Sequence, residues 1–443
     1  MKYLVILFSF LSFASLDFAF AKAEYNEFIP LKNGTKAQST YIHAGHVLDA
    51  DKGIWQEEMT IYVVDGLISD VRKGYQDVPE DGIYVDLKSQ WVMPGFTDMH
   101  VHMETEYNPH AYIQKYVDDP ADVAYDSVKY AEITLMSGFT TVRDLGGSGI
   151  NISLRDAVNK GKVPGPRIFT AGKSIASTGG HADPTNGSNQ KLMGDPGPRE
   201  GVINSPSEGR ESVRHRYKNG ADCIKITATG GVLSVAKNGS NPQFTIEEIK
   251  AITETANDYG FHVAAHAHGD EGMRRAVLGG VKTIEHGTYM SEETMDLMKK
   301  MDCYLVPTIT AGKEVALKAE EDGFYPAIVV PKAKAVGPQI QGTFSRAYKR
   351  GVPIVFGTDA GVFAHGKNGK EFGYMVEAGM PVMEALQSAT ITPAKILKLE
   401  EELGQIQKGF YADIIAVSEN PEENVAILEK MSFVMKDGVV YKR

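Results

Sequence analysis

Short apolar blocks and longer amphipathic stretches alternate along most of the chain. A short apolar run bounded by Gly, Pro or Asp predicts a strand, whereas apolar residues recurring every three or four positions predict a helix. Between residues 96 and 359 the two patterns take turns, which is typical of an α/β fold. The strands predicted in this region are the eight segments Phe96–His102, Thr140–Leu145, Pro166–Gly172, Asp222–Ala228, His262–His268, Lys282–Gly287, Cys303–Ile309 and Pro353–Asp359.

Helical signals fill the gaps between these strands. The stretch Thr245–Gly260 starts with a Thr-x-x-Glu capping box and ends at a glycine, and Asp270–Gly280 and Ser291–Met301 follow the same pattern. Eight strands alternating with helices predict a (β/α)8 TIM-like barrel, in which function lies at the carboxyl ends of the strands. A doubly wound open sheet is the competing fold, but the chain has no G-x-G-x-x-G motif and no P-loop to favour it.

Both ends of the chain read as strands and turns. Ile61–Val71 carries an Asp-Gly pair between apolar runs, which predicts a hairpin. Tyr411–Val417 is strand-like, and Phe433–Arg443 holds a second Asp-Gly hairpin. Neither end has enough strands to be stable alone, so we expect them to combine into one small β-sandwich domain. The predicted domains are a composite sandwich of residues 22–94 plus 400–443 and a barrel of residues 95–399.

The first residues form a secretory signal pattern. Lys2 precedes an apolar run from Leu4 to Leu16, and Ala19-Phe20-Ala21 provides an A-x-A cleavage site. We expect a signal peptide of residues 1–21 cleaved after Ala21, with an uncleaved anchor as the alternative. No cysteine follows the site, which disfavours a lipid anchor, and no later stretch is long and apolar enough to span a membrane. The mature protein is therefore expected to be periplasmic or secreted.

Composition narrows the classes of partner. A net charge of −11 argues against nucleic acid and anionic membrane surfaces. The chain has only two cysteines, Cys223 and Cys303, so it is not a disulfide-stabilised scaffold, and its length allows a large core. We interpret Cys223 as a small buried thiol rather than a nucleophile.

A first group of metal-ligand types lies at the ends of the first and eighth predicted strands. His100 and His102 form an H-x-H, and residues two apart on a strand point to the same face, so both rings can bind one ion. Asp359 ends the eighth strand, which neighbours the first in a closed barrel, and can reach the same ion. The alternative role for Asp359 is to cap the following helix.

A second group lies at the ends of the fifth and sixth strands. His266 and His286 end neighbouring strands and are suited to a second ion, whereas His262 lies near a strand start and is interpreted as structural. Lys225 is central in the apolar strand CIKIT and points into the barrel. A buried ammonium is costly, so Lys225 either pairs with an interior acid, forms a Schiff base, or reacts with CO2 to give a carbamate that bridges two metal ions. Beside the strand-end histidines we favour the carbamate.

The ordered motifs MPGFTDMHVH, IKITATGGV, VAAHAHG, TIEHG and GTDAG resemble those of the amidohydrolase superfamily. More narrowly, the chain is similar to the metal-dependent Xaa-Pro and Xaa-Arg(Lys) dipeptidases related to imidazolonepropionase, with the ochratoxin amidase as a relative. The likeness spans nearly the whole mature chain.

The resemblance implies two zinc ions, although other divalent metals suit the same ligands. It implies that His100, His102 and Asp359 hold one ion, that His266 and His286 hold the other, and that a carboxylated Lys225 bridges both. It also implies that His181, in the TGGH motif, polarises the scissile carbonyl, and that Asp359 moves the proton. His181, His268 and His365 are the implied substrate-binding residues.

The resemblance also implies a reaction: hydrolysis of the amide bond of a dipeptide or N-acyl amino acid, with release of the C-terminal residue. Arg274, Arg275 and Lys370 are the nearest candidates in sequence to bind the substrate carboxylate. Hydrolysis of cyclic amides of the imidazolone kind, or of an unusual amide such as ochratoxin, is the alternative within enzymes. A non-catalytic relative is disfavoured because every expected ligand position is filled. A homo-oligomer is possible.

Overall fold

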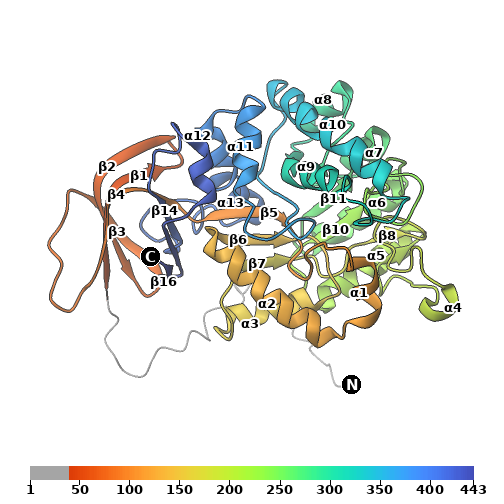
Figure 1. Cartoon of the computed structure of the whole chain (residues 1–443), viewed down its shortest axis with the longest axis horizontal. Helices are drawn as coiled ribbons and strands as arrows, with labels where there is room; N and C mark the ends of the chain where they lie inside the picture. The colour runs from red at the N-terminus through yellow and green to blue at the C-terminus, as the bar shows by residue number, and fades with distance from the viewer. Residues whose placement is uncertain (1–38) are drawn as a thin grey trace, which may run out of the picture.

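Parallel strands alternating with helices form the larger part of the fold, as the sequence predicts (Figure 1). The computed structural model describes residues 39–443, so the predicted signal peptide of residues 1–21 lies outside the described residues. Seven of the eight predicted strands are present. They are β5 (Phe96–Val101), β6 (Phe139–Asp144), β7 (Arg167–Thr170), β10 (Ile224–Thr227), β11 (Val263–Ala267), β12 (Thr283–His286) and β13 (Tyr304–Val306).

These strands belong to two parallel sheets, with orders β5-β6-β7 and β10-β11-β12-β13. Between them in sequence lies a two-stranded sheet of β8 (Ala176–Ser177) and β9 (Val202–Ile203). An isolated bridge between Ile175 and Ile226 links the region before β8 to β10.

The eighth predicted strand is the main departure from expectation. Residues 353–359 form no regular strand, and their pairing with neighbouring strands is limited to the isolated bridges Leu305–Ile354 and Val101–Ala360 and to scattered backbone hydrogen bonds with both sides. The N–H of Phe356 is directed instead to the carbonyl of Ser388. A ladder needs consecutive bonds to one neighbour. The described strands therefore do not form a continuously hydrogen-bonded closed barrel.

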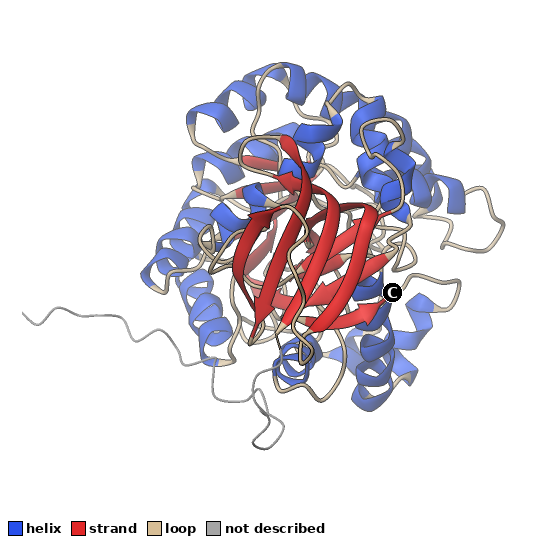
Figure 2. Ribbon diagram, turned by 90° about the vertical axis from the view of Figure 1, so that its left-hand side faces the viewer, coloured by secondary structure: helices blue, strands red, loops and turns tan. Residues whose placement is uncertain are grey.

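Helices follow the strands and cover them on the outside (Figure 2). The predicted capping box is confirmed, because Thr245 and Glu248 each accept a hydrogen bond from the other's backbone N–H. The helices are α1 (Ala111–Val117), α2 (Pro120–Met136), α3 (Ile150–Asn159), α4 (Gln190–Met193), α5 (Pro206–Lys218), α6 (Ile246–Asp258), α7 (Asp270–Leu278), α8 (Glu292–Lys300), α9 (Ile309–Lys318), α10 (Val330–Lys349), α11 (Lys370–Glu377), α12 (Val382–Ser388), α13 (Ile391–Leu397) and the 3-10 helix η1 (Val425–Glu429).

The two ends of the chain meet in one seven-stranded sheet, which faces the viewer in Figure 2. Its order is β16-β15-β14-β4-β1-β2-β3, so the C-terminal strands pair with β4 and extend the N-terminal set. All seven strands share one hydrogen-bonded sheet, and the folding of that sheet into a sandwich stays a prediction. The strands are β1 (Thr40–Asp49), β2 (Ile54–Val64), β3 (Leu67–Lys73), β4 (Ile83–Pro94), β14 (Ile414–Val417), β15 (Phe433–Lys436) and β16 (Val439–Lys442).

Both predicted hairpins close at their Asp-Gly pairs. Asp65 and Gly66 join β2 to β3, and Asp437 and Gly438 join β15 to β16, all with positive φ. Two successive left-handed residues match the twist of a tight hairpin, which is why Asp-Gly is favoured there.

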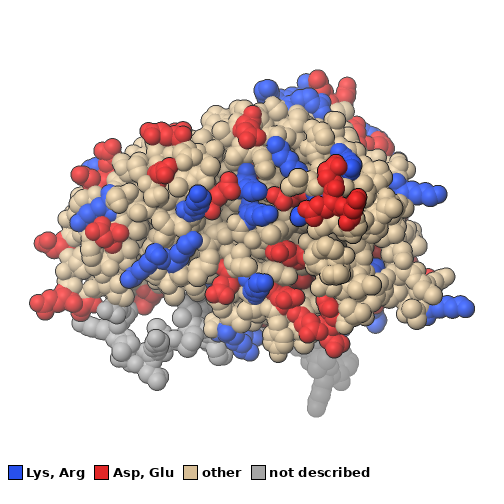
Figure 3. Space-filling model, in the orientation of Figure 1, with Lys and Arg blue, Asp and Glu red and all other residues tan. Residues whose placement is uncertain are grey.

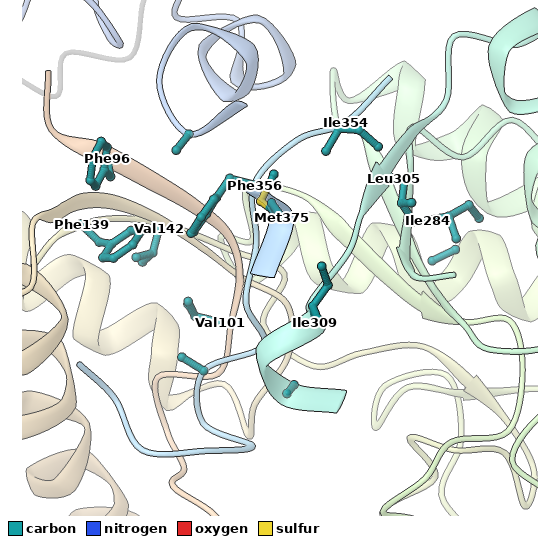
Figure 4. Packing of buried hydrophobic residues seen from close by; sticks show 14 of the residues in the cluster. Phe96, Val101, Phe139, Val142, Ile284, Leu305, Ile309, Ile354, Phe356 and Met375 are labelled. Carbon is teal, nitrogen blue, oxygen red and sulfur yellow. The ribbon is translucent and has the colours of Figure 1, made fainter. Parts of the chain in front are cut away.

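A large apolar core lies between the parallel strands and their helices. Phe96 of β5, Phe139 of β6 and Phe356 of the 353–359 segment point toward one another in it (Figure 4). This packing holds the irregular 353–359 segment beside β5 although few ladder bonds do so. None of the described helices combines the length and the apolar character that crossing a membrane requires. On the face shown in Figure 3, charges of both signs are interspersed.

Candidate metal centre and active site

The predicted ligands meet at the carboxyl ends of the parallel strands. His100 is the residue before the last in β5, His266 is in β11, and His286 is the last residue of β12. Among the described residues, two groups of His and Asp side chains have ligand atoms within 4.8 Å of one another. One is His100, His102 and Asp359, and the other is His266, His268 and His286.

The first group forms because side chains alternate along β5 and because Asp359 has a left-handed backbone with φ of 63°. Its carboxylate Oδ1 lies 3.4 Å from Nε2 of His100 and 3.3 Å from Nε2 of His102. Burial alone would raise the pKa of Asp359, but the neighbouring His100 and His102 outweigh burial and lower it. The carboxylate is therefore ionised.

The second group draws on neighbouring strands. Ala267 of β11 pairs with His286 of β12, which brings the strand-end imidazoles of His266, His268 and His286 together. His268 was expected only to line the substrate pocket, yet its position also fits the second metal group. Burial lowers the pKa of His266 and His286 well below the usual imidazole value and that of His268 to about 3. These rings are thus neutral, which is the form that binds metal.

Hydrogen bonds fix which nitrogen of each ring is free. Nδ1 of His100 donates to the Glu285 carboxylate at 2.9 Å, and Nδ1 of His102 donates to the carbonyl of Gly146 at 2.7 Å. Nε2 of His266 donates to the carbonyl of Gly230 at 3.0 Å. Since these partners can only accept, the opposite nitrogen of each ring keeps its lone pair.

A cation fits the first group by this chemistry. Oδ1 of Asp359 is buried without a hydrogen-bond partner and faces Nε2 of His100 and Nε2 of His102. Burial lowers the pKa of His102, but the Asp359 carboxylate outweighs burial and raises it, which shows that this place favours positive charge. A divalent ion held by the carboxylate and the two rings supplies that charge. The residues present therefore suit a metal.

Lys225 lies between the two groups. Its Nζ is 3.3 Å from Nε2 of His100, and only 3% of the residue is exposed. Burial lowers the pKa of Lys225 to about 8, and its charge in turn lowers the pKa of both His100 and His286. A buried amine with a lowered pKa is more often neutral and so more nucleophilic than an ordinary lysine.

Sequence reasoning missed a buried ion pair behind His100. Glu285 of β12 accepts from His100 on one oxygen and from Arg143 of β6 on the other, at 3.0 Å. Both charged residues are fully buried. The available signal was a charged residue in each of two apolar strand segments, TTVRDL and TIEHG. The sequence left open an unnamed interior acid as a partner for Lys225; Glu285 is an interior acid, but it hydrogen-bonds to Arg143, His100 and Thr283.

His181 lies beside the second group. Its ring stacks on that of His266 with 4.3 Å between centroids, and its Nδ1 has no hydrogen-bond partner. Burial lowers the pKa of His181 to about 3, so the ring is neutral. Gly231 lies against this ring, and a Cβ there would come within 2.2 Å of it. The glycine at 231 is therefore required for the ring to occupy this position.

A cavity of about 460 Å³ opens over both groups, a size suited to a small molecule. Most of its wall away from the histidines is apolar, and its described charged side chains other than Lys225 and Asp359 are Lys173 and Glu200. The apolar wall comprises Leu145, Val232, Leu233, Ala311, Val315, Val336, Ile340 and Val362.

A family model of the amidohydrolase family matches residues 91–442. The chain belongs to the amidohydrolase family. It is 30% identical over 429 residues to the ochratoxinase of Aspergillus niger, covering 92% of this chain and 87% of that protein.

Solved structures of similar proteins cover the same region. An Xaa-Pro dipeptidase with methionine bound in its active site matches at 52% identity and a TM-score of 0.89, covering 92% of this chain and 100% of that one. A prolidase in complex with N-methylphosphonate-L-proline matches at 31% identity and a TM-score of 0.84, again covering 92% and 100%. This amidohydrolase is therefore similar to dipeptidases across its described fold.

Four candidate substrate-binding residues do not reach the cavity of this amidohydrolase. His365 stacks on Tyr130 and bonds to the carbonyl of Thr105. Arg274 and Arg275 pair with Glu271 on the outside of α7. Lys370 bonds to Glu314 at 3.1 Å. Adjacency in sequence to a strand-end motif did not determine where these side chains point.

Proposed function

We propose that this amidohydrolase cleaves the amide bond of dipeptides or N-acyl amino acids and releases the C-terminal amino acid. The observation that carries the proposal is the convergence of two histidine groups, an ionised Asp359 and a buried Lys225 beneath one small cavity. Metal-assisted hydrolysis needs such a ligand set next to a space for substrate.

The proposed cofactors are two zinc ions, with other divalent metals possible. His100, His102 and Asp359 would hold one ion and His266 and His286 the other, with a CO2-derived carbamate on Lys225 bridging them. When bound, the ions would supply a water of lowered pKa as the nucleophile and polarise the substrate carbonyl.

The chain's own residues would then handle the proton and the substrate. The Asp359 carboxylate is proposed to take the proton of the attacking water and to pass it to the leaving amine. Neutral His181, held on Gly231, is proposed to donate to the carbonyl oxygen as negative charge develops there. The apolar wall would exclude water around the scissile bond.

The substrate side chain is proposed to be apolar. The resemblance to Xaa-Arg(Lys) dipeptidases leaves a basic C-terminal residue open, but such a preference needs a free acid in the pocket. Apart from Asp359, the cavity offers only Glu200, which accepts a hydrogen bond from the N–H of Gly197. Proline, methionine and aromatic residues suit the aliphatic wall better. A second candidate substrate is an ochratoxin-like amide, which the similarity to ochratoxinase supports.

Hydrolysis of an Xaa-Yaa dipeptide panel by protein prepared with zinc and bicarbonate tests the proposal. We expect turnover that varies with the C-terminal residue and is lost in Lys225→Ala. Lys173→Ala removes the other lysine of the cavity wall, which belongs to neither histidine group, and is the matched control for metal chemistry. Equal turnover of C-terminally amidated substrates would replace the dipeptidase proposal with one of cyclic or unusual amides.

We also propose, from the sequence, that the protein is exported to the periplasm or beyond after cleavage near Ala21. We further propose that residues 95–399 close into a (β/α)8 barrel and that the protein assembles into a homo-oligomer.

A further inference from the structure

A single lysine outside the cavity lining binds a loop that contacts His266, His181 and the apolar wall of the cavity. The loop is residues 230–241, between β10 and α6, and is called here the 230–241 loop. It is closed at its base by the N–H of Gly230, which donates to the carbonyl of Asn241. Lys332 of α10 donates from Nζ to three of its carbonyls, those of Gly231 at 3.0 Å, Ser234 at 2.7 Å and Ala236 at 2.9 Å.

This arrangement uses the full donor capacity of the ammonium group. A lysine has three N–H donors and no acceptor, and here each donor has its own carbonyl. None of the ion pairs found among residues 39–443 involves Lys332, although the side chain is half-buried. Burial lowers the pKa of Lys332 to about 8. With its donors occupied and no place in the cavity wall, Lys332 is not available to bind a substrate carboxylate.

The 230–241 loop touches three functional parts of the site. The carbonyl of Gly230 accepts from His266 and so fixes which nitrogen of that ring is free. Gly231 lies against the His181 ring. Val232 and Leu233 form part of the apolar cavity wall. A shift of this loop would therefore move the surroundings of His181 and the wall together.

We propose that Lys332 is a positioning residue that holds the 230–241 loop in its active geometry. It acts through the loop, because its Nζ contacts only loop carbonyls. Tyr112 of α1 adds one weaker anchor, since its hydroxyl donates to the carbonyl of Leu233 at 2.7 Å. The consequence for turnover rests on the proposed function, whereas the consequence for loop closure does not.

Limited proteolysis tests loop closure without a substrate. Lys237 is exposed within the loop and offers trypsin a site there. Opening exposes a chain segment to protease in proportion to the open population. In Lys332→Met we expect cleavage after Lys237 to be about tenfold faster or more, because charge-assisted bonds to three carbonyls are lost.

Lys334→Met is the matched control, because Lys334 lies on the same helix and bonds only to Glu320 at an exposed position. It should cleave at the wild-type rate. Lys332→Gln keeps part of the donor capacity and should fall between wild type and Lys332→Met, which keeps the test usable if the methionine variant does not fold. Wild-type cleavage after Lys237 in either Lys332 variant would overturn the proposal.

Kinetics separates positioning from general stability. If dipeptides are turned over, Lys332→Met should lower kcat at unchanged bound-metal content. The reason is that Gly231 no longer holds the His181 ring in place, while the metal-ligand side chains remain. Wild-type kcat in a variant with an opened loop would overturn the positioning role. If wild type turns over no dipeptide, the proteolysis result still decides loop closure by itself.

Discussion

Replacing Glu285 by glutamine should separate fold stability from metal affinity. The two carboxylate oxygens of Glu285 have different hydrogen-bond partners: one accepts from His100, and the other accepts from Arg143 and Thr283. Glutamine offers only one oxygen, so its amide N–H must face either the His100 Nδ1–H or the Arg143 guanidinium. Either orientation leaves a donor against a donor in a fully buried place.

The expected magnitude follows from these two losses. Breaking one partner of a buried ion pair costs about 3–5 kcal/mol, because Arg143 keeps its charge without a counter-charge. Removing the carboxylate behind a ligating imidazole lowers metal affinity by about 10–100-fold. We therefore expect Glu285→Gln to lose both stability and metal affinity.

Denaturant unfolding of the metal-free protein and titration of metal against a competing chelator measure the two effects. The double variant Arg143→Met with Glu285→Gln should regain much of the stability, because no buried charge is left unpaired. It should not regain metal affinity, since His100 still lacks its carboxylate. Wild-type stability in Glu285→Gln, or metal affinity restored in the double variant, would refute the reasoning.

Four further outcomes are expected at the same site. Asp359→Asn should lower kcat by about 10²–10⁴-fold while keeping much of its metal, and near-native turnover would remove Asp359 from proton transfer. Gly231→Ala should lower kcat by about a hundredfold, because the new Cβ would come within 2.2 Å of the His181 ring, and unchanged kcat would show that His181 is not needed where it lies. A chelator should lower the unfolding temperature, since the ligand lone pairs then face one another without a cation. Metal restored without bicarbonate should return full activity only if Lys225 carries no carbamate.

Patterning predicted the parallel strands and the helix starts because both signals are local. Side-chain alternation placed His100 and His102 on one face, and the capping box of Thr245 and Glu248 marked the start of α6. The 353–359 segment has the composition of a strand but not its hydrogen bonds. Its N–H groups are shared among several neighbours, and no local pattern encodes that choice.

The features that could not be predicted from the sequence depend on contacts between segments that are distant along the chain. The Arg143–Glu285 ion pair joins β6 to β12, and no local sequence pattern around either residue identifies the other as its partner. His365 follows the GTDAG motif closely, yet stacking on Tyr130 of α2 holds it outside the cavity. Strand ends fix side-chain direction through the ladder, whereas loop residues take it from tertiary packing.

The seven-stranded sheet combines strands from both ends of the chain, so it cannot be completed until synthesis is nearly finished. During synthesis, β4 pairs with β1 while its other edge stays open until β14 emerges near the end of the chain. An open edge recruits other strands, and pairing across so long a loop is slow. Loss of the chain from β14 onward would thus expose β4 in the middle of the sheet, whereas loss of β16 alone would trim its border. Pairing of β14 with β4 therefore protects the N-terminal strands from pairing with other molecules.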